Sequence, residues 1–96
     1  MLRDKGFFAK VKLPALASSG IARVPLSKLG ISPAAYGDLQ VVLCTTVNAT
    51  VEVAKDSNGV YGLKFTGTGS VSANTIVYIY CQVVSEAVEV TAVADA

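Results

Sequence analysis

The sequence predicts an all-β domain: an antiparallel β-sandwich or small Greek-key barrel, jelly-roll-like, with an extended N-terminal segment. Apolar and polar residues alternate with a period of two along most of the chain, and almost nothing repeats at the helical period. The apolar runs are rich in β-branched residues, and turn-forming residues separate them at spacings of roughly ten residues. With 96 residues, the chain suits one domain and one core.

The first predicted strand covers residues 7–13. The period of two places Phe7, Ala9, Val11 and Leu13 on one face and Phe8, Lys10 and Lys12 on the other. Pro14 ends this strand, because proline cannot donate to a strand ladder. Residues 15–20 form a flexible connection, and the next extended piece, 21–26, is restricted by Pro25 to a sheet edge or a bulge.

Residues 27–36 are the only candidate for a helix. Ser32 followed by Pro33 is a helix start signal, and Gly37 is a stop, so we expect one turn of α-helix or 3₁₀ helix.

From Asp38 onward the chain has the pattern of a meander. The segment 39–46 looks buried on both faces at its centre, Val41 to Cys44. The turn at 56–59 contains Asn-Gly, which predicts a type I′ hairpin, and a second turn or loop is expected at 67–70. Further strands are expected at 49–54, 60–66 and 75–84, the last as a central strand.

The C-terminal residues 87–94 still alternate. Such a terminal strand can pair with a neighbouring chain, join its own sheet or stay disordered.

Catalytic, cofactor and metal sites are not expected. The chain contains no histidine, which removes Ser-His-Asp and Cys-His arrangements and most zinc and iron sites. Cys44 and Cys81 each lie in an apolar strand, so we expect two reduced, buried thiols. The acidic residues lie in turns, on outward strand positions or in the tail, and none forms a paired-carboxylate site. The sequence therefore predicts a protein that is not an enzyme.

The composition favours a subunit of an assembly. Hydrophobic residues make up 52% of the chain and charged residues only 16%, against about 25% charged in a typical soluble domain. A domain of this length cannot hide all of that apolar surface, so some of it should form a contact surface. Residues 1–30 carry a net charge of +5 and residues 31–96 a net charge of −4. We expect the basic segment to pair with the acidic part of its own or an adjacent identical subunit.

Several other classes are disfavoured. No apolar run is long enough for a spanning helix, and the start of the chain lacks the continuous apolar region of a secretory signal. Nucleic-acid binding is not expected either, because Lys64 is the only basic residue in 61–82, beside the aromatic side chains that could stack on bases. A carbohydrate- or receptor-binding module, with Tyr61, Tyr78 and Tyr80 as its contact face, stays open as an alternative.

The chain has a characteristic sequence pattern in three places: the opening from Leu13-Pro14 to Gly20, the stretch from Val24 to Pro33 and the Val/Thr/Ala-rich strands after Asp38. In this it resembles small β-sandwich structural proteins of tailed bacteriophage particles, such as capsid decoration proteins, head-fibre bases and short tail modules. The resemblance implies a virion protein, assembled in the host cytoplasm, that associates with itself, as a trimer or around another symmetry axis. It also implies attachment to a larger scaffold such as a major capsid or tail protein.

This hypothesis divides one domain, 1–96, into three parts. Residues 1–20 form a basic strand and linker that docks on the particle, residues 21–86 form the β core, and residues 87–96 form a terminal strand or tail. The predicted partner-binding residues combine the docking strand with the tyrosines, and they are Phe7, Phe8, Lys10, Lys12, Tyr61, Tyr78 and Tyr80.

Overall fold

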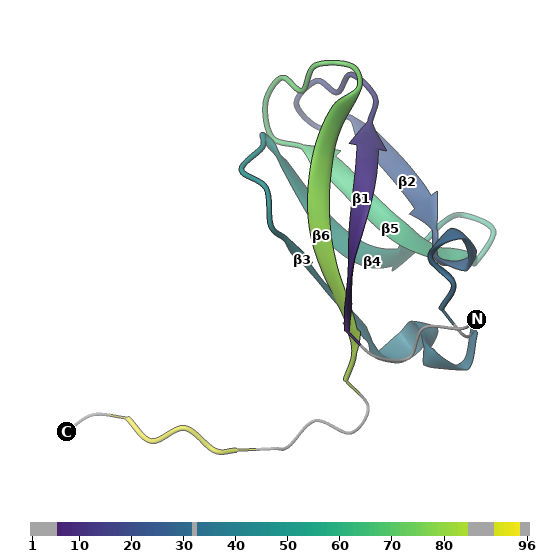
Figure 1. Ribbon diagram of the computed structural model, residues 1–96, viewed down its shortest axis with the longest axis vertical. Helices are drawn as coiled ribbons and strands as arrows, with labels where there is room; N and C mark the ends of the chain where they lie inside the picture. Colours follow the sequence, from purple (N-terminus) through teal and green to yellow (C-terminus); the bar gives the residue numbers. More distant parts are fainter. Residues whose placement is uncertain (1–5, 32, 85–89, 95–96) are drawn as a thin grey trace.

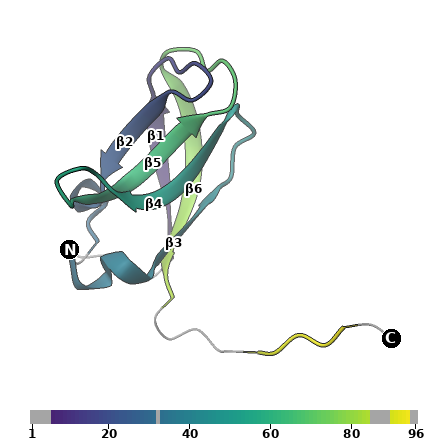
Figure 2. The same cartoon turned by 180° about the vertical axis from the view of Figure 1, so that it is seen from behind.

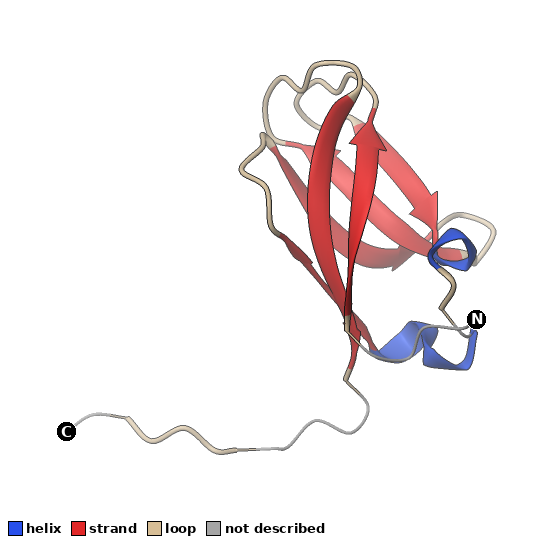
Figure 3. Ribbon diagram, in the orientation of Figure 1, coloured by secondary structure: helices blue, strands red, loops and turns tan. Residues whose placement is uncertain are grey.

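The computed structural model contains six strands in two antiparallel three-stranded sheets that face each other as in a β-sandwich (Figures 1 and 3). It describes residues 6–31, 33–84 and 90–94. The strands are β1 (Phe7–Leu13), β2 (Ile21–Pro25), β3 (Leu39–Leu43), β4 (Ala49–Lys55), β5 (Tyr61–Gly67) and β6 (Thr75–Val83). Two short 3₁₀ helices, η1 (Leu26–Leu29) and η2 (Pro33–Asp38), lie between β2 and β3, where the sequence predicts a single helical turn within 27–36. The predicted stop at Gly37 is wrong, because η2 continues through it to Asp38. The all-β prediction is confirmed.

The first sheet has the order β1-β6-β3 and the second has the order β2-β5-β4. In the first sheet β6 is the central strand, as its length and β-branched content predict. In the second sheet β5 is central, and β2 lies at an edge, where Pro25 is tolerated because its missing N–H faces no partner strand.

The strand path follows a Greek-key order. The strands β3, β4 and β5 come one after another, and the chain then returns so that β6 lies beside β3. The step from β3 to β4 crosses from one sheet to the other without a strand ladder (Figure 2). This step leaves one edge of each sheet unpaired on the same side of the molecule.

The core lies between the two sheets and is built from alternate strand residues. Its most completely buried side chains are Leu13, Leu26, Ile31, Leu63, Phe65, Val77, Ile79 and Cys81. Burying a side chain of this size fully contributes about 1.5 to 3 kcal/mol. Because alternation places the apolar residues of a strand on one face, this gain determines which face of each strand points inward.

The β4–β5 turn lies where the sequence predicts it, but its geometry differs from the expected type I′. Gly59 has a φ of 77°, whereas Asn58 does not have a positive φ. The Gly59 N–H donates to the Asp56 carbonyl at 3.0 Å, and the Asp56 N–H donates to the Val60 carbonyl at 2.9 Å. This is a type I turn closed by a glycine in the left-handed region, the usual three-residue hairpin.

The predicted double burial of residues 41–44 is wrong. Because β3 belongs to a two-layer sandwich, only the face of β3 that points toward the second sheet is covered. Val42 is 59% exposed and Cys44 is also exposed, while Leu39, Val41 and Leu43 face the interior.

The N-terminal strand is part of the core sheet rather than a separate docking arm. Leu13 is 1% exposed and Val11 is 8% exposed, both in the same cluster as Val77. Phe7 also packs against this cluster. Only the other face of β1 is free for contacts.

The C-terminal strand predicted at 87–94 is not formed over its described part. Residues 90–94 are exposed and belong to no strand, and residues 87–89 lie outside the described residues. The described segment lies away from the two sheets (Figures 1 and 2).

Candidate interaction surface

The outer face of the β1-β6-β3 sheet carries four of the eight exposed large apolar side chains among the described residues. Phe8 is 70% exposed, Val42 is 59%, Tyr78 is 49% and Ile76 is 38%. We call this the aromatic face; it consists of Phe8, Lys10, Lys12, Gln40, Val42, Ile76, Tyr78, Tyr80 and Gln82. A concentration of exposed apolar groups on one face is typical of a contact surface.

The strand register brings residues distant in sequence into one row. Phe8 on β1 and Val42 on β3 both lie opposite Tyr80 on β6. The rings of Phe8 and Tyr80 meet edge to face, with centroids 5.0 Å apart and an angle of 62° between their planes. Edge-to-face pairs of this kind add about 0.5 to 1.5 kcal/mol beyond the burial of their area. The row is therefore ordered before any partner arrives.

Gly6 lets the Tyr80 ring lie against the sheet. A Cβ atom at Gly6 would overlap the Tyr80 hydroxyl oxygen. Because glycine has no side chain, the half-buried Tyr80 ring can lie directly over Gly6, next to the start of β1.

The charged groups on the aromatic face are all basic. Lys10 lies opposite Tyr78 and Lys12 lies opposite Ile76. No residue of this face is acidic. The face thus combines exposed apolar rings with positive charge along one side.

The opposite face of the molecule has a different character. On the outer face of the β2-β5-β4 sheet, Arg23, Lys64 and Glu52 form one row across the three strands. The Lys64 ammonium and the Glu52 carboxylate are 3.9 Å apart, an exposed pair that contributes little stability. Ile21, Thr66 and Thr50 form the next row, in which Ile21 is 50% exposed. This polar face is the expected solvent-facing side of a sandwich.

The structure brings together five of the seven predicted partner-binding residues: Phe8, Lys10, Lys12, Tyr78 and Tyr80 share the aromatic face. Phe7 points to the other side of β1 and packs on the core. Tyr61 lies in the second sheet, with its ring 5.9 Å from that of Tyr36. Lys55 approaches the same Tyr61 ring at 5.0 Å. Neither Phe7 nor Tyr61 belongs to the aromatic face.

Sequence reasoning missed four members of this face: the polar Gln40 and Gln82 and the apolar Val42 and Ile76. Ile76 shares the alternation of Tyr78 and could have been found from that signal. Val42 was hidden because a continuous apolar run resembles a strand covered on both faces. Val42 is exposed because it lies on the outer face of a sheet that is covered on one side only, like Tyr78 on the central strand β6.

The two cysteines lie on opposite sides of the first sheet. Both thiols are free: Cys81 is buried in the core, and Cys44 is exposed just beyond β3. The prediction of two buried thiols is therefore wrong for Cys44. Burial, with a smaller contribution from the charge of Cys44, raises the pKa of the Cys81 thiol to about 11.

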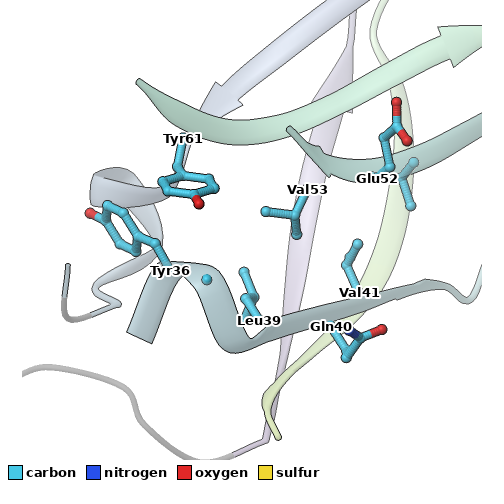
Figure 4. A pocket seen from close by; sticks show the side chains of 9 residues that line it. Tyr36, Leu39, Gln40, Val41, Glu52, Val53 and Tyr61 are labelled. Atoms are coloured by element: carbon cyan, nitrogen blue, oxygen red, sulfur yellow. The ribbon is translucent and has the colours of Figure 1, made fainter. Parts of the chain in front are cut away.

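A cleft opens between the diverging edge strands β3 and β4. Its volume is about 380 Å³. We call it the edge cleft; its lining comprises Tyr36, Gly37, Leu39, Gln40, Val41, Val51, Glu52, Val53 and Tyr61. Figure 4 shows Leu39, Val41 and Val53 pointing into this space, with Tyr36 and Tyr61 at one end. The lining combines apolar side chains such as Leu39 and Val53 with polar groups, including Gln40 and Glu52.

Within the described residues 6–31, 33–84 and 90–94, no three His, Cys, Asp or Glu side chains come together in a cluster that could hold a metal ion. Within the same ranges, no helix has the length and apolar character needed to cross a bilayer.

Comparison with known protein families, with curated proteins and with solved structures found no match.

Proposed function

We propose that this chain is a non-enzymatic structural subunit of a tailed-phage particle, which attaches to a capsid or tail surface as a decoration, cement or fibre-base protein and associates with copies of itself. The observation that supports this proposal is the aromatic face, with its exposed Phe8, Val42, Ile76 and Tyr78. The outer face of the second sheet is mainly polar, with Ile21 as its exposed large apolar residue, so the aromatic face is the one that favours permanent contact with another protein.

The charge of the aromatic face favours a larger scaffold over a second copy as its occupant. A two-fold contact between two such faces would bring the same patch together with itself. Lys10 and Lys12 would then meet basic groups with no acidic group on the face to offset them. A scaffold surface with an apolar centre and an acidic rim is complementary to this face.

The direct test uses phage particles that lack the subunit. Purified chain is mixed with them, the particles are sedimented, and bound chain is quantified. We expect Val42→Lys to weaken particle binding at least tenfold, about 1.4 kcal/mol, because it places a charge in the apolar row that Val42 forms with Tyr80 and Phe8. Thr50→Lys is the matched control, since it puts the same charge at an exposed strand position on the polar face.

Two results would count against the proposal. Equal loss of binding in both lysine variants would show that the contact does not use the aromatic face. Binding to a glycan array that is lost in Tyr78→Ala, without particle binding, would support the carbohydrate-binding alternative instead.

A further inference from the structure

The edge cleft is bordered by β3 and β4, two sheet edges that have no partner strand within residues 6–31, 33–84 and 90–94. The Val84 N–H donates to the Asp38 carbonyl at 3.0 Å, and the Cys44 N–H donates to the Tyr78 carbonyl at 2.8 Å. Hydrogen-bonded pairs recur every second residue in an antiparallel ladder. In β3, Leu39, Val41 and Leu43 alternate with the residues that are hydrogen-bonded to β6. They therefore direct their N–H and C=O groups away from β6, toward the cleft.

The same reasoning applies to β4. The Thr68 N–H donates to the Asn48 carbonyl at 2.9 Å, and the Asp56 N–H donates to the Val60 carbonyl at 2.9 Å. Val51 and Val53 lie between these pairs and direct their main-chain groups to the free edge. Their side chains are only half-buried. The cleft thus offers unpaired main-chain groups and partly covered apolar side chains together, which is what an added strand requires.

The same chain carries a segment with the properties of such a strand. Residues 90–94, Val-Thr-Ala-Val-Ala, are all exposed, and Val90 and Val93 are 82% and 89% exposed. Five residues in extended form span about 17 Å. This equals the length of β3, which also has five residues.

We infer that residues 90–94 of one copy enter the edge cleft of a second copy and add a strand there. Main-chain hydrogen bonds to the free edges would provide affinity, and alternate small apolar side chains would cover Val41 and Val53. A strand given by one copy and received by the next is a head-to-tail contact, which generates rings or open arrays.

The position of the tail favours a second copy over the tail's own domain. The hydrogen bond from Val84 to Asp38 holds the end of β6 beside the start of β3. To reach its own cleft, a tail that leaves the end of β6 would first have to cross β3, which lies between β6 and the cleft, and then reverse its direction. Only residues 85–89 separate Val84 from the segment 90–94, which lies away from the body (Figure 1).

This inference deepens the proposed function, since it names the contact between copies, but its test needs no particle. The molecular mass of the pure full-length chain is measured by native mass spectrometry and sedimentation at micromolar concentration. We expect the wild type and Ala92→Ser to form complexes of two or more copies of the chain. Ala92→Pro should weaken them at least tenfold, because proline cannot donate to a ladder.

The receiving side is tested by Val53→Lys, which places a charge in the cleft. We expect this variant alone to be monomeric. An equimolar mixture of Ala92→Pro and Val53→Lys should form a one-to-one pair, because the first keeps an intact cleft and the second keeps an intact tail. If Val53→Lys does not fold, a peptide of residues 84–96 added to the wild type replaces it and should dissociate the complexes.

Three outcomes would overturn the inference. The first is a monomeric wild type, including one in which hydrogen exchange shows residues 90–94 protected within a single chain. The second is undiminished association of Ala92→Pro. The third is loss of self-association in Val42→Lys, which would assign the copy-to-copy contact to the aromatic face. Failure of particle binding alone would refute the proposed function and leave this inference standing.

Discussion

The two cysteines show how a single position in a sheet determines side-chain chemistry. Cys81 faces the core with no exposed surface, whereas Cys44 lies in solvent near the aromatic face. Thiolate is the reactive form, and burial disfavours it. We therefore expect a thiol reagent to modify one cysteine per folded chain rapidly and both in denaturant, with peptide mapping assigning the fast site to Cys44.

The pH dependence of stability provides a check on Cys81. Its pKa is raised from an ordinary value of 9.0 to about 11 in the folded state. The contribution of the protonated Cys81 thiol to the free energy of unfolding is therefore fully present below pH 9, and it is lost as the pH rises toward 11. A Cys81→Ala variant should lack this alkaline component in urea unfolding, whereas Cys44→Ala should retain it.

Asp56 organises the β4–β5 turn through its carboxylate. Its Oδ1 accepts hydrogen bonds from the N–H groups of Val60 at 2.9 Å and Asn58 at 2.8 Å. The bond from Val60, with further help from Asn58 and Arg23, lowers the pKa of Asp56 below its ordinary value of 3.8. The stabilisation is therefore present above that ordinary pKa and is lost as pH falls through the lowered one.

For Asp56→Ala we expect a lower free energy of unfolding than wild type at pH 7, measured by urea denaturation. The difference should shrink as the pH falls below 3.8. Ser57→Ala is the control, because it changes an exposed side chain of the same turn. A pH-independent difference would show that the carboxylate charge does not contribute.

At the scale of elements, the end of β5 passes unusually close to the loop between β1 and β2. The Gly67 N–H donates to the Gly20 carbonyl at 2.8 Å, and the Ser19 N–H donates to the Gly67 carbonyl at 2.8 Å. A Cβ atom at Gly67 would overlap the Ala17 carbonyl oxygen. The two hydrogen bonds and the missing side chain together hold this loop against the sheet.

We expect Gly67→Ala to destabilise the fold by about 1 to 3 kcal/mol, since backbone rather than a flexible side chain would have to move. Gly37→Ala is the matched control: a Cβ there meets nothing within 4 Å, so its effect should stay within about 0.5 kcal/mol. Thermal unfolding followed by circular dichroism measures both. Equal stability of the two variants would contradict the close approach.

Element boundaries were predictable where local signals are strong. Pro14, the Asp56 to Gly59 turn and the β-branched run of β6 each mark a boundary or a strand that the structure confirms. The exposure of Val42 was not predictable, because it depends on the outer face of its sheet being left uncovered, which is a property of how the two sheets pack.

At the scale of the whole molecule, the two sheets give the domain two chemically different outer faces. The polar row of Arg23, Lys64 and Glu52 suits water, whereas the aromatic face suits another protein. Val42→Lys and Thr50→Lys both add charge at exposed positions, so both variants should unfold with nearly wild-type free energies. Any difference between them in particle binding then reports the face and not the fold.

The sequence by itself determined the β class, the two-residue period that assigns each side chain to one face of its strand, and the absence of histidine chemistry. These are local or compositional properties. The tertiary structure decided which strands became neighbours. It placed Phe8, Tyr80 and Val42 in one row and left β3 and β4 with free edges around a cleft. The physical reason is that alternation specifies a face for every strand but not its partner, since pairing depends on how all six strands bury their apolar faces together.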